Sequence, residues 1–155
     1  MQALRQEEAK GTSQLQDWNM ECKDLDQGGK LENLKTELQK NEVSVLGVSE
    51  ARCKGKGEIR SGDYAVYYSG GERAERGVAI VVHKSVVRSV VKKTVCNDRI
   101  LSIKLKAEPV SILIMQVYMP TSEYEDDEVE KLYGTIEEIL EEDGKVDTNS
   151  IILGD

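Results

Sequence analysis

Residues 100–120 read ILSIKLKAEPVSILIMQVYMP and contain the two strands around which the rest of the chain can be arranged. Ile100–Leu105 begins with two apolar residues and then alternates, which is typical of a strand with one buried face. Residues 110–118 are almost continuously apolar, so they predict a central strand that Pro120 ends. The short spacing between these two runs favours an antiparallel meander.

Further elements are expected on both sides of this stretch. Before it, strands are predicted at 43–48, 64–68, 78–82 and 86–91, with residues 51–62 as a basic loop and His83 as an exposed loop residue. Apolar residues at helical spacing predict one helix over 30–40 and another over 127–142. Residues 150–154 read as a last strand. The order of elements indicates a mixed α/β (α+β) fold with helices packed outside sheets.

Length and composition limit the possible classes of protein. A chain of 155 residues suffices for one globular domain. It contains no apolar run of the roughly 20 residues that a membrane span requires. Residues 1–17 are polar and aperiodic and are expected to be a disordered leader. The first twenty residues lack a secretory signal, so an intracellular location is expected, with nucleus and cytoplasm both open. The three cysteines have no paired spacing and are expected to be reduced thiols.

Charge is segregated along the chain. Residues 121–155 carry thirteen acids against two bases, whereas residues 50–106 carry thirteen Lys or Arg against six acids. The basic region 50–106 could follow the phosphate backbone of DNA. The alternative is two solvated surfaces of opposite sign, and charge alone favours that alternative.

Six short motifs occur in a fixed order: Trp18-Asn19, Val48-Ser49-Glu50, Gly77-Val-Ala-Ile80, Asp98-Arg99, Val117-Tyr118-Met119-Pro120 and Leu153-Gly154-Asp155. In this order and spacing the chain resembles the endonuclease/exonuclease/phosphatase superfamily, which includes deoxyribonuclease I and the endonuclease domains of non-LTR retrotransposons. The resemblance implies a four-layer α/β sandwich. It also implies that residues 18–155 are a partial domain, the N-terminal half, truncated at its C-terminus.

The resemblance assigns roles to five residues. Glu50 would bind a divalent cation, Mg²⁺ or Mn²⁺, with Asn19 beside it, because hard cations prefer oxygen ligands. Tyr118 would donate a hydrogen bond to the scissile phosphate, and Asp155 would polarise the attacking water. Arg99 would fix a nearby phosphate or loop. The implied reaction is metal-dependent hydrolysis of DNA phosphodiester bonds.

The chain also departs from the superfamily pattern. The catalytic histidine and the later aspartates of the superfamily lie beyond the motif that ends at Asp155. The chain is therefore expected to be weakly active or inactive as it stands. The alternative is a catalytically dead module that binds nucleic acid or protein, and a phosphatase is a third possibility. Half of a sandwich would leave a sheet uncovered, so self-association and poor solubility are expected.

Overall fold

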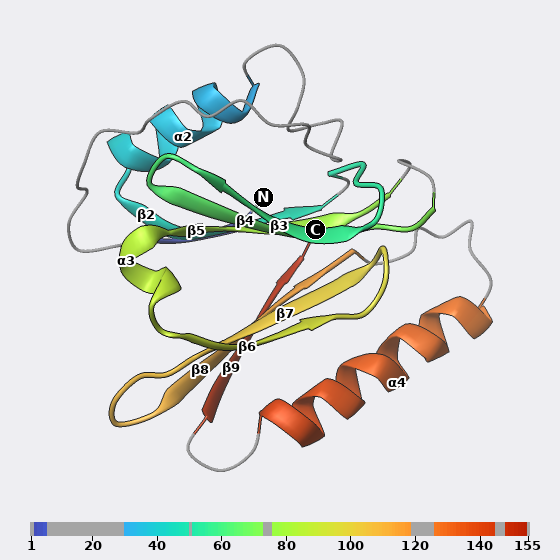
Figure 1. Cartoon of the computed structure of the whole chain (residues 1–155). Coiled ribbons are helices and arrows are strands. Elements are labelled where there is room, and N and C mark those ends of the chain that lie inside the picture. Colours follow the sequence, from blue (N-terminus) through green and yellow to red (C-terminus); the bar gives the residue numbers. More distant parts are fainter. Residues whose placement is uncertain are drawn as a thin grey trace.

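The computed structural model describes residues 2–5, 30–49, 51–72, 76–118, 126–144 and 148–154. They form two β-sheets with helices on their outer faces (Figure 1). The first sheet has the order β1-β2-β5-β4-β3 and is antiparallel throughout, with strands Gln2–Arg5, Val43–Ser49, Val78–His83, Tyr64–Ser69 and Lys56–Ser61 in that order. The second sheet has the order β6-β7-β8-β9, with strands Val90–Val95, Ile100–Leu105, Ser111–Val117 and Thr148–Gly154.

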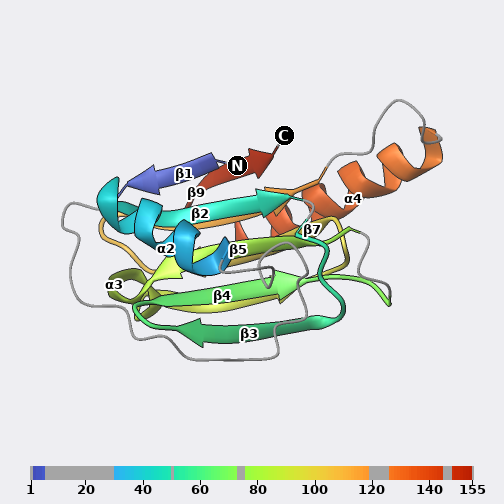
Figure 2. The same cartoon turned by 90° about the horizontal axis from the view of Figure 1, so that it is seen from above.

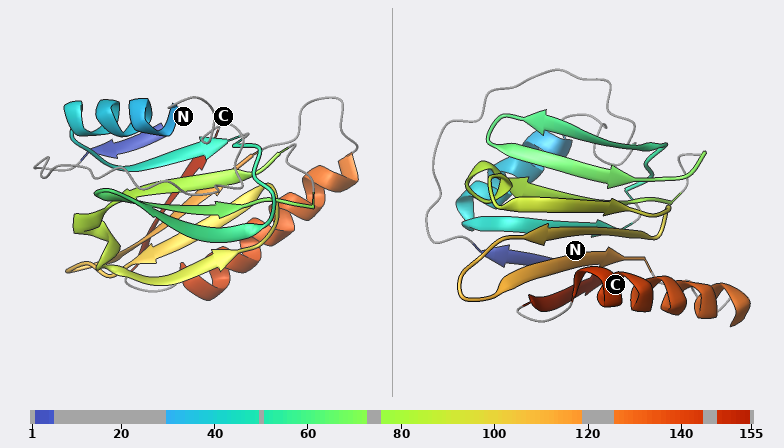
Figure 3. Two further views of the ribbon diagram at one scale, coloured as in Figure 1. Left: turned by 45° about the horizontal axis from the view of Figure 1, so that its top comes forward. Right: turned by 60° about the horizontal axis from the view of Figure 1, so that its bottom comes forward.

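The helices are α2 (Lys30–Lys40), α3 (Lys84–Val87) and α4 (Asp126–Asp143). Helix α2 lies across the outer face of the first sheet, as the view from above shows (Figure 2). Helix α4 connects β8 to β9, the one parallel pair among the described strands, and runs along the outer face of the second sheet (Figure 3). The layers therefore follow the order helix, sheet, sheet, helix, which confirms the predicted mixed sandwich.

Three apolar clusters hold these layers together. The cluster under α2 includes Leu38, Leu46, Val48, Val66 and Val81. The cluster between the sheets includes Val45, Ile80, Val82, Leu101, Ile103 and Ile114. The cluster under α4 includes Ile100, Leu113, Met115, Leu132, Ile136 and Ile139. Neighbouring residues of β7 and β8 alternate between the second and third clusters because successive side chains of a strand point to opposite faces.

The predicted uncovered sheet is not found among the described residues. The chain supplies strands to both sheets, and their inner faces cover each other through the middle cluster. The expected basis for self-association was therefore wrong. The prediction failed because the sequence pattern did not show that the strands within 43–83 and those within 90–154 belong to two different sheets that pack on each other. Strand β5 in particular pairs with β2 and β4 rather than with the later meander.

Several element predictions agree with the structure and others do not. The strand Ile100–Leu105 has the predicted bounds, and β8 lies within the predicted 110–118. The expected strand over 86–91 was wrong, because α3 ends at Val87 and β6 begins at Val90. His83 was also misplaced: it is 1% exposed, and its ring accepts a hydrogen bond from the Ser85 backbone N–H at 3.1 Å, capping α3.

Two strands were missed because they lie at the edge of the first sheet. Strand β3 occupies part of the predicted loop 51–62, and its charged residues point to solvent between less exposed ones. Strand β1, Gln2–Arg5, falls in the predicted disordered leader and pairs with β2; the rest of that leader lies outside the described residues. Edge strands often carry charged side chains, so their sequences lack a strong apolar period.

The cysteine prediction was wrong for one residue. Cys53 is disulfide-bonded and fully buried beside the first sheet. Cys96 is a free thiol at the end of β6, as predicted. Among the residues that the structure describes, no helix combines the length and the apolar character needed to cross a membrane.

Candidate functional site

Strands that carry the predicted site residues end at the same end of the sandwich. Ser49 is the last residue of β2 and pairs with Val78, the first residue of β5. In the second sheet, Val117 at the end of β8 pairs with Gly154 at the end of β9. A side-chain hydrogen bond of 2.7 Å from Gln116 to Ser49 joins the two sheets at this end. Ser49, Tyr118 and Gly154 therefore lie at one end of the sandwich.

Arg99 and Tyr118 are in direct contact at this end. The Tyr118 backbone N–H donates to the Arg99 carbonyl at 2.8 Å, and the Arg99 guanidinium lies 5.3 Å from the centre of the Tyr118 ring. Arg99 also donates to the Tyr118 carbonyl at 3.4 Å and is only 7% exposed. A cation over an aromatic face is favourable, and the stacking holds both side chains in place. Two of the five predicted site residues thus form a fixed pair.

The turn before β7 sets the position of Arg99. The side-chain oxygen of Asn97 accepts hydrogen bonds from the backbone N–H groups of Arg99 at 2.8 Å and Ile100 at 3.1 Å. The first sheet holds the same turn from the other side, because the Ser69 hydroxyl donates to the Asn97 carbonyl at 2.5 Å. An asparagine that bonds its own backbone two residues onward is a common turn device. These hydrogen bonds fix the backbone at the start of β7 and so fix the point from which the Arg99 side chain extends.

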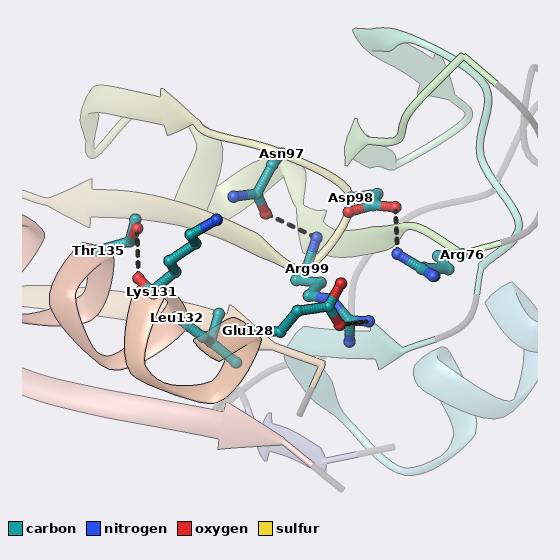
Figure 4. A pocket seen from close by; sticks show the side chains of 8 residues that line it. All are labelled: Arg76, Asn97, Asp98, Arg99, Glu128, Lys131, Leu132 and Thr135. Atoms are coloured by element: carbon teal, nitrogen blue, oxygen red, sulfur yellow. Dashed lines mark hydrogen bonds and ion pairs between the residues drawn. The ribbon is translucent and has the colours of Figure 1, made fainter. Parts of the chain in front are cut away.

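A pocket of about 250 Å³ opens beside this turn, against the first part of α4 (Figure 4). It is lined by Arg76, Asn97, Asp98, Arg99, Glu128, Lys131, Leu132 and Thr135. Two ion pairs in its wall are long, 3.5 Å for Arg76 with Asp98 and 3.8 Å for Arg99 with Glu128. Charge-assisted hydrogen bonds are usually about 2.7–2.9 Å long. Three cations against two carboxylates leave the pocket with a positive balance suited to an anion.

The segment after position 50 passes close to glycines of the first sheet. The Ala51 N–H donates to the Gly77 carbonyl at 3.0 Å, and the Cys53 N–H donates to the Arg76 carbonyl at 2.9 Å. A Cβ at Gly70 would lie 2.0 Å from the Cys53 carbonyl oxygen, and one at Gly77 would lie 2.7 Å from the Cys53 nitrogen. Gly77 also has a φ of +108°. Side chains at either position would push this segment out of place.

The other three predicted site residues, Glu50, Asn19 and Asp155, lie outside the described residues. The described part of the chain contains no group of three or more His, Cys, Asp or Glu placed to hold a metal ion.

Sequence reasoning missed most of the pocket and the bridge between the sheets. Glu128 and Lys131 were read as part of a solvated helix face, and Asn97 carried no predicted role. Gln116 was read only as part of a central strand. The one available signal was its polar side chain in the otherwise apolar run 111–117.

The basic region 50–106 is partly neutralised within the molecule. Lys92 pairs with Asp143 at 2.5 Å, Lys93 with Glu58 at 2.9 Å and Lys84 with Asp63 at 3.1 Å. The hydrogen bond to Asp143 raises the pKa of Lys92. Glu58 and Asp63 are already among the six acids of this region, so only the pair of Lys92 with Asp143 lowers its positive charge below the sequence count.

Cys96, close to the pocket turn, has the electrostatics of a structural thiol. Burial, the largest cause, raises the pKa of the Cys96 thiol; the charge of Lys56 opposes this rise, and nearby acids add to it. The thiol therefore stays protonated near neutral pH, which disfavours a role as nucleophile.

The fold and the site define a class: a four-layer α/β sandwich that presents a phenol, a guanidinium and a cation-lined pocket where its central strands end. No known family profile matches the chain. It is 35% identical over 128 residues to craniofacial development protein 2 of Bos taurus and 34% identical over 128 residues to that of Tragulus javanicus. Each match covers 82% of this chain and 22% of the relative. The chain is thus homologous to craniofacial development protein 2 and corresponds to about a fifth of its length.

Proposed function

We propose that this chain carries part of the active site of a divalent-metal-dependent DNA endonuclease of the endonuclease/exonuclease/phosphatase superfamily. The observation that supports this most is the convergence of β2 and β8 at one end, with Tyr118 stacked against Arg99. The six superfamily motifs in order support the same class, and so does the α/β sandwich. These features agree with one another although each is weak alone.

In this proposal each site residue has a role that follows from the chemistry of its side chain. Glu50 and Asn19 would hold a Mg²⁺ or Mn²⁺ ion through oxygen atoms, and the ion would supply neutralisation of charge on a phosphate. Asp155 would orient the water that attacks phosphorus. The Tyr118 hydroxyl donates a hydrogen bond to a phosphate oxygen, where negative charge grows during the reaction. Arg99, held by Tyr118 and the Asn97 turn, adds a fixed positive charge next to that phosphate.

Plasmid nicking by the purified chain tests the proposal. Nicking should require Mg²⁺ or Mn²⁺, stop with EDTA and stop with Glu50→Ala. Tyr118→Phe removes only the hydroxyl and should lower the nicking rate about a hundredfold. Tyr133→Phe is a matched control, because Tyr133 lies 53% exposed on α4. A Glu50→Ala variant that nicks as fast as the wild-type chain contradicts the proposal. A folded wild-type chain that does not nick agrees with a partial active site and directs the test to DNA affinity.

The second candidate is a binding module without catalysis, which the pocket favours. Arg76, Arg99 and Lys131 line one cavity at the converging strand ends, and Lys131 is exposed on α4. Such a surface can hold a phosphate of a nucleic acid without any reaction. A folded chain that binds duplex DNA with a clear salt dependence and does not nick supports this candidate. A chain without salt-dependent affinity for DNA excludes a nucleic-acid-binding module and leaves only a module that binds protein.

A further inference from the structure

A glutamine amide lies in the apolar layer between the two sheets. Ile112, Ile114 and Gln116 alternate along β8 and face the first sheet, and the two isoleucines belong to the apolar cluster there. Gln116 is 2% exposed. Its side-chain N–H donates to the Ser49 hydroxyl at 2.7 Å, across 67 positions of sequence. The amide therefore ties the end of β8 to the end of β2.

A glycine on β2 makes room for this amide. A Cβ at Gly47 would lie 1.8 Å from the Gln116 side-chain oxygen, 2.9 Å from its carbonyl carbon and 3.0 Å from a methyl group of Leu153. Leu153 is the neighbour of Gln116 on β9. The amide thus fits among three strands, β2, β8 and β9, each just before its last residues.

The Gln116 amide is only partly paired in this layer. Its side-chain oxygen is buried, and no hydrogen-bond partner for it lies in the described part of the chain. A buried amide oxygen without a partner lowers stability, whereas a methionine of similar length would fill the space without that penalty. A polar group at a position that an apolar one could fill with less penalty indicates a demand other than stability.

We infer that Gln116 is a positioning residue that fixes Ser49, the last residue of β2, relative to Tyr118. This inference rests on the proposed function, in which Glu50 and Tyr118 act on one phosphate. The amide acts through the backbone ends of β2 and β8 and not by touching substrate. A small displacement of groups that must act together lowers the rate strongly, whereas it changes global stability little.

Gln116→Met tests the inference, with Ile114→Met as a matched control one step earlier on the same face of β8. Gln116→Met should melt at the same temperature as wild type or higher. Hydrogen exchange of the Ser49 and Tyr118 backbone amides should become about tenfold faster, because the strand ends lose their link. The turnover number for nicking should fall about tenfold or more with little change in KM. Ile114→Met should leave exchange and nicking near wild-type values.

Ser49→Ala removes the acceptor and keeps Gln116, so it repeats the test in case Gln116→Met folds poorly. Its effects on exchange and nicking should match those of Gln116→Met, and the double variant should add nothing further. Unchanged exchange at Ser49 and Tyr118, or unchanged nicking in an active protein, overturns the inference. If the wild-type chain does not nick, exchange at the two amides decides alone whether Gln116 links the strand ends, and a Glu50→Ala variant that nicks normally overturns the proposed function instead.

Discussion

Gly47→Ala should destabilise the protein by displacing one identifiable side chain. The new methyl group would lie 1.8 Å from the Gln116 side-chain oxygen, so the amide must move. Its hydrogen bond to Ser49, 2.7 Å long, is then lost in a layer where Gln116 is 2% exposed. No left-handed backbone is involved at Gly47, so the steric contact alone decides the outcome.

The expected size follows from two contributions. Breaking the hydrogen bond leaves a buried donor unpaired, which costs about 1–3 kcal/mol. Replacing glycine by alanine restricts the unfolded chain and offsets about 0.4–1 kcal/mol of this cost. The net loss is about 1–2 kcal/mol, which lowers the melting temperature of a chain of this size by about 2–8 °C.

Thermal and urea unfolding of four proteins measures this effect: wild type, Gly47→Ala, Gln116→Ala and the double variant. Because the shorter side chain at position 116 removes the clash, the double variant should be more stable than the sum of the single changes predicts, by about 1 kcal/mol or more. A Gly47→Ala variant as stable as wild type within about 0.5 kcal/mol, or a cycle without coupling, would refute this reasoning.

Three further predictions concern other parts of the chain. Burial, followed by the charge of Asp63, raises the pKa of Tyr64 to about 12. Between pH 10 and 12 this tyrosine therefore ionises mainly in the unfolded chain, and stability should fall by about 2–3 kcal/mol across that range. Tyr64→Phe should lose this alkaline decrease in urea unfolding at several pH values, and a decrease that persists would assign it to other groups. The variant should be at least as stable at pH 7, since no partner for the buried Tyr64 hydroxyl lies among the described residues. Gly77→Ala should lower the melting temperature by several degrees, because its φ is +108° and its Cβ would meet Cys53, and an unchanged melt would contradict the close approach. Lys131→Glu should weaken duplex DNA binding and reduce the slope of log affinity against log salt by about one, and an unchanged slope would exclude the pocket from the interface.

The regular elements were predictable where apolar residues follow one local period. Strand β7 has the predicted bounds because its alternation is set by burial on one face. A strand was wrongly predicted over 86–91 because valines favour strands. In the structure the His83 ring instead caps the short helix α3 by accepting a hydrogen bond from the Ser85 backbone N–H. Strand β3 was not predicted because an edge strand with solvent-facing charges lacks a strong apolar period.

The candidate site was predictable only in part. The contact between Arg99 and Tyr118 agrees with their shared assignment to the site, although their roles stay predictions. The bridge from Gln116 to Ser49 joins residues 67 positions apart in different sheets, so no local pattern contains it. The pocket was not predicted for the same reason. Its walls come from α4, the turn before β7 and Arg76, which meet only after the layers pack.

The division of the strands between the two sheets also affects the order in which the chain can fold during synthesis. The described strands of the first sheet lie within residues 2–83 and those of the second within residues 90–154. The first sheet can therefore leave the ribosome while the second is still untranslated. Until β7 and β8 emerge, the side chains of Val45, Ile80 and Val82 lack the partners that cover them in the finished sandwich. We expect a nascent chain paused before residue 100 to depend on chaperones that bind exposed apolar surface, and a chain released past residue 117 to depend on them much less.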